Sequence, residues 1–269
     1  MMQIFGFWKL RILKVDIFFR SLIFSSIMDW NDEGILLNTT PHGEHSAILQ
    51  VFTPKKGRHA GMIRNAYSPK KMSILQPSAQ LSLSWSSRLE EHLGNFKVDL
   101  IRTRADVLMA NRIALAAFNS LSALCISILA ERDPMPDLYS VTEQFLDKIA
   151  TQENWEFLYL DWELKLLSCI GFGLELDKCA VTGATENLAY ISPKSGKAVC
   201  QDIGEDYHAK LLPFPIILRS DRNGKSTSLE ELVLGLDLTG FFIEKWLDYS
   251  IENKKTMMIR KRFIHSLLA

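Results

Sequence analysis

Apolar and polar residues alternate along the first third of the chain. Every second residue is apolar between positions 80 and 85, and the same period of two returns between positions 96 and 100. Residues typical of turns separate the alternating segments, at positions 41–43, 54–57 and 93–95. The pattern predicts about five short strands between Asp29 and Arg104, enough for a small closed or nearly closed β-barrel.

After Arg104 the apolar positions recur at steps of three and four, which predicts a buried helix through positions 108–128. The proline-containing stretch 133–137 ends it, and two more helices are expected through 141–149 and 155–170. Gly171 and Gly173 would end the last of these. The aromatic stripe on that helix is interpreted as core packing rather than as a platform for nucleic-acid bases.

Glycine and proline recur through positions 174–225, which predicts a small irregular insertion. Thr227 or Ser228, each three residues before a glutamate, would begin another helix, which positions 237–240 are expected to interrupt. The chain ends in a basic helical segment. The prediction is an α+β fold with a barrel at 29–104 and an all-helical domain at 105–269 that carries the insertion.

The first 27 residues are rich in Phe, Ile and Leu, but charged residues interrupt them. No uncharged run approaches the ~20 residues of a membrane span, and a signal peptide would need a continuous apolar stretch. An interfacial amphipathic helix remains open. We favour an upstream start or an unpacked extension, so residues 1–28 are expected to form a leader outside the fold. Only four cysteines are present, which favours a reducing, cytoplasmic setting. No membrane partner is expected.

The chain carries 31 basic and 31 acidic residues, so any affinity for nucleic acid must come from local clusters. Six cations without a carboxylate stand between positions 55 and 71, and we predict that they bind a phosphate backbone: Lys55, Lys56, Arg58, Arg64, Lys70 and Lys71. Tyr67 and Phe52 could stack on bases. The alternative is a merely solvated face. A second DNA contact is expected at Lys254, Lys255, Arg260, Lys261 and Arg262.

Metal and catalytic signatures are weak. Cys179 and Cys200 each begin what could have been a Cys-x-x-Cys pair, but Thr182 and Ile203 stand at the partner positions. Zinc needs four thiolate or imidazole ligands, and His208 could supply only a third, so we predict no metal. The histidines of the segment 42–45 lie in a predicted turn. Since phosphate loops, nucleophile elbows and dinucleotide fingerprints are absent, we expect neither an enzyme nor a cofactor.

Three ordered groups of motifs resemble the RecO family of recombination mediators. They are Trp-Asn-Asp-Glu-Gly-Ile-Leu-Leu at 30–37 with 43–49 and 53–58, then 164–172 with 176–183, and finally 259–268. The resemblance spans 29–269 and implies an N-terminal OB-fold, a helical domain and, in some members, a zinc-binding insertion. The chain departs from that pattern in the insertion, where Thr182 and Ile203 stand at the expected cysteine positions.

The resemblance also implies a function. A RecO-like protein is expected to bind single-stranded DNA, anneal strands and, with RecR, help load the recombinase RecA on DNA coated with single-stranded DNA-binding protein, whose tail is a further partner. Such a protein would be cytoplasmic and associated with the nucleoid during repair. Two other hypotheses stay open: an OB-fold adaptor for RNA or protein, and a metal-dependent hydrolase using His42 and His45.

Overall fold

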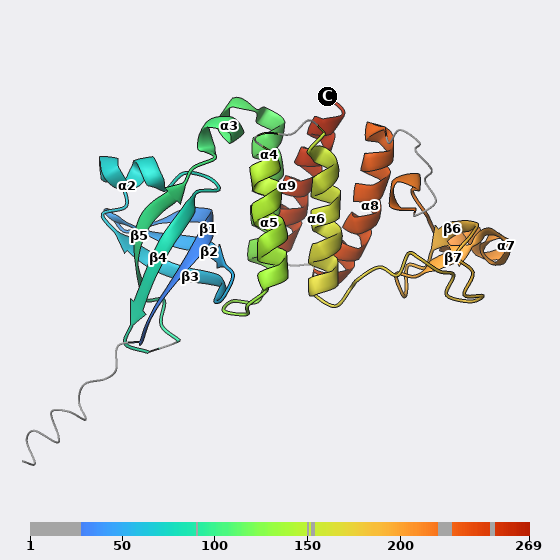
Figure 1. Cartoon of the computed structure of the whole chain (residues 1–269), viewed down its shortest axis with the longest axis horizontal. Helices are drawn as coiled ribbons and strands as arrows, with labels where there is room; N and C mark the ends of the chain where they lie inside the picture. The colour runs from blue at the N-terminus through green and yellow to red at the C-terminus, as the bar shows by residue number, and fades with distance from the viewer. Residues whose placement is uncertain (1–27, 90, 150, 152–153, 220–227, 248–250) are drawn as a thin grey trace, which may run out of the picture.

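The computed structural model describes residues 28–89, 91–149, 151, 154–219, 228–247 and 251–269. A barrel, a helical layer and a small outlying subdomain follow one another along the longest axis of the molecule (Figure 1). Within the described residues, no helix is both long and apolar enough to cross a membrane.

Five strands close the N-terminal barrel in the order β1-β2-β3-β5-β4. All neighbours pair antiparallel except β3 and β5. The strands are β1 (Met28–His42), β2 (Ser46–Thr53), β3 (Gly57–Arg64), β4 (Gln80–Ser87) and β5 (Asn95–Arg102). The predicted five-stranded, OB-like barrel is therefore confirmed. Met28 already pairs with Ser87, so its assignment to the leader is wrong, and residues 1–27 lie outside the described part of the chain.

The barrel has two apolar faces. Leu36 packs inside the barrel, whereas Ile35 and Leu37 join the core of the helical domain, because successive side chains of a strand point to opposite sides. The short helix α2 (Pro69–Ile74), which alternation did not predict, connects β3 with β4. It begins with a proline at its first turn, where a missing backbone N–H costs no hydrogen bond.

Six helices form the second layer: α3 (Ala105–Ala110), α4 (Arg112–Ile128), α5 (Pro136–Lys148), α6 (Glu156–Cys169), α8 (Leu229–Trp246) and α9 (Ile251–Leu267). The expected continuous helix after Arg104 is divided at Asn111, whose side chain caps α4 by accepting from two backbone amides. Helix α8 runs unbroken through positions 237–240, so the predicted interruption is wrong. Ser228 caps it, and Thr227 lies outside the described residues.

The insertion is more regular than its glycines and prolines suggested. A three-stranded sheet in the order β7-β6-β8 organises it, with β6 (Leu188–Ile191), β7 (Ala198–Cys200) and β8 (Leu212–Pro213). The helix α7 (Gln201–Gly204) and the 3-10 turns η1 (Glu205–Lys210) and η2 (Ile216–Leu218) complete its described part. The prediction of an irregular segment failed because strands of two to four residues are too short to show a period.

Polar contacts join the barrel to the helices. The Ser122 hydroxyl donates to the Leu37 carbonyl at 2.7 Å, and Gln80 donates to the Tyr139 hydroxyl at 2.8 Å. Arg104, only 3% exposed, donates to Gln80 at 3.2 Å and pairs with Asp147 at 2.7 Å. Because buried polar groups that lose a partner are costly, these bonds hold the two layers in one arrangement.

Candidate nucleic-acid interface

The six cations between positions 55 and 71 do not form one patch. Lys55 and Lys56 lie in the turn before β3, whereas Arg64 ends that strand and the last two cations lie on α2. A strand rises ~3.3 Å per residue, so the eight residues of β3 separate the two groups by roughly 20 Å or more. The two groups are close in the sequence but lie at opposite ends of β3, and so at opposite ends of the barrel.

A shallow pocket gathers the group at the Arg64 end. Its volume is about 540 Å³, and its lining includes His45, Arg64, Tyr67, Lys70 and Lys71. The backbone amide of Ala66 donates to the His45 carbonyl at 2.9 Å and so holds the β3–α2 loop against the β1–β2 turn. The Tyr67 ring is 43% exposed. Three cations and an open aromatic ring thus face one hollow.

The cations of this pocket differ in freedom. Arg64 and Lys70 are exposed, and neither has an ion pair with a described residue. Lys71 is half-buried and donates from Nζ to the Val98 carbonyl at 3.1 Å, which fixes its ammonium while leaving two further protons for an anion. The hollow is therefore positive and partly preorganised.

The second group is a tight turn. The Lys55 amide donates to the Asp32 carboxylate at 3.1 Å, and the Lys56 amide to the Thr53 hydroxyl at 3.0 Å. Gly57 follows with a φ of +64°, a conformation that costs glycine little. Both lysine side chains are exposed, so this turn presents two ammonium groups from a fixed backbone.

Arg58 has a different role from the one its sequence neighbours suggested. Its Nε donates to the Leu129 carbonyl at 2.9 Å and its Nη1 to Gln50 at 3.0 Å. Its own carbonyl accepts from the Arg132 amide at 2.7 Å. These bonds commit Arg58 to the junction between barrel and helices rather than to an open surface. Phe52 is fully buried and cannot stack on a base, so that expectation is wrong.

Arg260 is also misassigned by the charge pattern. Its side chain is 2% exposed, and the opposing Glu163 is fully buried. The guanidinium donates from Nε and Nη2 to the two oxygens of Glu163, both at 2.7 Å, and from Nη2 to the Leu236 carbonyl. A buried arginine paired in this way has no surface to offer a phosphate. The prediction of Arg260 as a DNA contact is therefore wrong.

The other cations of α9 point in different directions. A helix turns ~100° per residue, so Arg262 lies about 200° from Arg260 and faces outward. Arg262 lines a groove of about 370 Å³ together with Leu37 and Asn38 of the barrel. Lys255 is exposed, and Lys254 and Lys261 border a separate groove.

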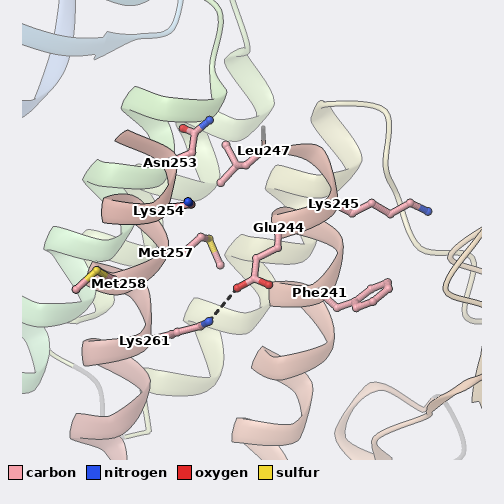
Figure 2. Close-up of a pocket in the computed structure, with 9 residues that line it drawn as sticks. All are labelled: Phe241, Glu244, Lys245, Leu247, Asn253, Lys254, Met257, Met258 and Lys261. Carbon is pink, nitrogen blue, oxygen red and sulfur yellow. Dashed lines mark ion pairs between the residues drawn. The ribbon is translucent and has the colours of Figure 1, made fainter. Parts of the chain in front are cut away.

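That separate groove lies between α8 and α9 and has a volume of about 530 Å³. Figure 2 shows Met257 and Lys261 extending from α9 toward α8, where Lys261 meets Glu244, whereas Met258 and the ring of Phe241 border the groove and extend away from the space between the two helices. Lys261 pairs with Glu244 at 3.0 Å. Phe241 is 39% and Met258 55% exposed. An open apolar groove bordered by lysine ammonium groups suits a peptide that carries both apolar side chains and carboxylates.

The candidate zinc ligands do not form a zinc site. The Cys179 and Cys200 sulfurs lie 3.4 Å apart, and the neutral hydroxyl of Thr182 lies 3.8 Å from the Cys200 sulfur. His208 is exposed and bonds the carbonyl of Glu205. Within the described residues, no three His, Cys, Asp or Glu side chains could hold a metal ion. The residues present therefore do not fit zinc. For the same reason, His42 and His45 have no third metal ligand among the described residues.

Comparison with known proteins agrees with this arrangement. Residues 28–104 match the family model described as "Recombination protein O N terminal", and residues 109–249 match "Recombination protein O C terminal". The chain belongs to the recombination protein O family. The RecO resemblance inferred from the motifs is thereby confirmed.

Several relatives are named DNA repair protein RecO. The one from Ruegeria sp. strain TM1040 is 42% identical over 240 residues, 89% of this chain and 98% of that protein. The one from Roseobacter denitrificans is 43% identical over 239 residues, again 89% and 98%. The one from Dinoroseobacter shibae is 41% identical over 241 residues, 90% and 98%. Membership in RecO supports a role in DNA repair and recombination and agrees with a non-enzymatic protein.

The sequence predicts Tyr67 and the cations of the hollow, and it predicts the cations of α9, but it does not indicate the apolar residues of the groove between α8 and α9. Phe241, Met257 and Met258 form the groove only because α8 and α9 pack side by side. No local pattern distinguishes these residues from core residues, because α9 also buries apolar residues on its opposite face. The exposure of Phe241 and Met258 in the folded chain is the signal that identifies them, whereas Met257 is only 7% exposed.

Proposed function

We propose that this protein is a recombination mediator that binds single-stranded DNA on the barrel. The observation that carries the proposal is the hollow where Arg64, Tyr67, Lys70 and Lys71 converge. Cations neutralise phosphates and release counterions, and an exposed ring stacks on any base. Such contacts position a strand without reading its sequence, which is what a mediator working on any damaged site requires.

The experiment is a salt titration of single-stranded DNA affinity. Each phosphate contact contributes about 0.7 to the slope of log affinity against log salt. Replacing Arg64, Lys70 and Lys71 with Ala should lower the slope by roughly two. Replacing Lys55 and Lys56 should lower it by about 1.4 if that turn also touches the strand. Tyr67→Ala should weaken binding by about 1–3 kcal/mol with the slope unchanged, because stacking releases no counterions.

A matched control removes the same charge elsewhere. Lys178, Lys194 and Lys210 are exposed and lie in the insertion, at the far end of the molecule from the barrel (Figure 1). Their triple replacement with Ala should leave the slope within about 0.3 of the original. An equal loss for both triple variants would mean that net charge, not the hollow, governs binding. Tighter binding of RNA than of DNA of the same sequence would favour the adaptor hypothesis.

Annealing follows if two strands are neutralised at once, because their mutual repulsion then falls. Of the five cations predicted for the second contact, Arg260 is buried, and Lys254 and Lys261 border the groove between α8 and α9. The second contact would therefore consist of Lys255 and Arg262 on α9. The Arg262 groove includes Asn38 of the barrel, so the two contacts belong to adjoining parts of the molecule. Annealing rates for DNA coated with single-stranded DNA-binding protein, with and without RecR, test the mediator role. RecA would act on the product, in the cytoplasm and at the nucleoid.

We assign the groove between α8 and α9 to the tail of single-stranded DNA-binding protein, the partner that the family resemblance implies. The groove fits an acidic, partly apolar peptide, because methionine side chains adapt to varied apolar partners and Lys254 has no ion pair with a described residue. Binding of a labelled tail peptide should fall at least tenfold for Lys254→Glu and for Phe241→Ala. Leu234→Ala, which removes an exposed side chain of α8 outside the groove, should leave it unchanged.

A further inference from the structure

Two thiols in the insertion lie in contact. The sulfurs of Cys179 and Cys200 are 3.4 Å apart, and their residues are 2% and 7% exposed. The backbone next to them is pinned, since the Ala180 amide donates to the Ala198 carbonyl at 2.8 Å. A disulfide bond is ~2.05 Å long, so bonding needs the sulfurs to approach by about 1.3 Å, within the reach of side-chain rotation.

The environment favours the thiolate of Cys179. Burial raises the pKa of this thiol, but hydrogen bonds from the Thr182 hydroxyl and from neighbouring backbone amides outweigh it and lower the pKa to about 6. The Cys200 amide is one of these donors, at 3.3 Å from the sulfur. Residues 180–187, which follow Cys179 directly, are all exposed, so the thiol adjoins a surface loop.

The two other cysteines lack these features. Cys125 is fully buried in the helical core, and burial raises its pKa to about 12. Cys169 is half-buried near the end of α6, and burial raises its pKa as well. Because the thiolate is the nucleophile, reactivity should concentrate at Cys179.

We propose that Cys179 and Cys200 are an oxidative modification site that a hydroperoxide converts into an intramolecular disulfide. The Cys179 thiolate attacks one oxygen of hydrogen peroxide, the O–O bond breaks, and the departing hydroxide takes a proton to become water. The product is a sulfenic acid. Cys200 then attacks the Cys179 sulfur, the S–O bond breaks, and the hydroxide leaves with the Cys200 proton as a second water. Two thiols lose two electrons, and one peroxide is reduced to two waters.

The bond would close a ring that contains β6 and β7 and would tie the loop after α6 to the end of β7. Such a cross-link restrains the unfolded insertion, a role that a bound zinc ion fulfils where four ligands are present. The site is therefore a covalent alternative to a metal that this ligand set does not fit.

The test treats the full chain with hydrogen peroxide, unfolds it in denaturant, blocks the remaining thiols with an alkylating agent and maps the peptides without reduction. We expect two of the four cysteines to escape alkylation and a peptide linking Cys179 with Cys200, about 2 Da lighter than the sum of its parts. Dithiothreitol should restore both thiols. Full alkylation of this pair after oxidation, or a cross-link through Cys169, would overturn the proposal.

Two variants sharpen the result. Cys125→Ser with Cys169→Ser should still form the cross-link at an unchanged rate. Cys200→Ser removes the resolving thiol, so Cys179 should stop at the sulfenic acid and be trapped by dimedone. Stoichiometric zinc in the purified chain, released as the two thiols are oxidised, would show a metal site and would also refute the proposal. Because the wild-type peptide map requires no substitution, the proposal stays testable even if a variant fails to fold.

Discussion

The buried ion pair of Glu163 and Arg260 tests directly whether Arg260 of α9 belongs to the core rather than to a DNA-binding surface. Replacing Arg260 with Met keeps the apolar stem but leaves the fully buried Glu163 carboxylate without its partner. Breaking a buried ion pair on one side costs about 3–5 kcal/mol, because one charge stays desolvated and uncompensated. With a urea slope near ~2 kcal/mol/M, the unfolding midpoint should fall by about 2 M.

The pair can be isolated by a double-mutant cycle measured by urea unfolding. The carboxylate also accepts from the Thr239 hydroxyl at 2.5 Å, so Glu163→Gln disturbs two partners. Removing both charges, with Glu163→Gln and Arg260→Met together, should cost at least ~2 kcal/mol less than the sum of the single changes. Additive losses would show that the pair is not coupled.

The control is Arg262→Met on the same helix. Its exposed side chain should change the unfolding free energy by no more than ~0.5 kcal/mol, and the salt slope of DNA affinity should fall by about 0.7 if it contacts a phosphate. Arg260→Met should instead lower the unfolding free energy by about 3–5 kcal/mol, and the molecules that stay folded should keep the salt slope of the unchanged protein. If Arg260→Met instead costs under ~1 kcal/mol and lowers the salt slope, the assignment of Arg260 to the core is refuted.

Three further predictions concern the scaffold. Gly57→Ala should lower the free energy of unfolding by over about 2 kcal/mol, because its new Cβ would lie 2.0 Å from the Asp133 carbonyl oxygen. Gly43 also has a positive φ but faces open space, so Gly43→Ala should cost about 1 kcal/mol. Urea unfolding of the two variants compares these costs. Asn111→Ala should cost about 1 kcal/mol by removing the α4 cap, and equal stability of this variant would contradict the capping role. Burial lowers the pKa of His59 below its ordinary 6.5, so the unfolded chain binds the proton more readily than the folded chain. The free energy of unfolding should therefore fall as the pH drops from 6.5, by at most ~1.4 kcal/mol per pH unit. His59→Phe should flatten that pH dependence.

The salt-slope and cross-linking experiments address different parts of the chain. The first concerns the barrel, and the second concerns two thiols in the insertion. Failure of one leaves the other standing, because neither Cys179 nor Cys200 lines the hollow beside Arg64. An inactive DNA surface would therefore not be mistaken for an unreactive thiol pair.

The sequence by itself determined the α+β class, the five strands and the main helices. Periods of two and of three to four follow from the geometry of strand and helix, and they are visible wherever one face is buried. Trp155, Tyr159 and Trp162 were predicted as core, and all three are buried. Family membership was also predictable, because ordered motifs survive at about 40% identity.

Only the tertiary structure decided which charges are available. Arg260 and Arg262 are two residues apart and chemically alike, yet one is buried against Glu163 and the other is exposed. The six cations between positions 55 and 71 are one cluster in the sequence. In the structure five of them lie at the two ends of β3, and Arg58 is bonded at the junction of barrel and helices. Burial and pairing depend on contacts made across 97 residues of chain, as from Glu163 to Arg260. Charge patterns record none of these long-range contacts, since a guanidinium group serves a phosphate or a buried carboxylate equally well.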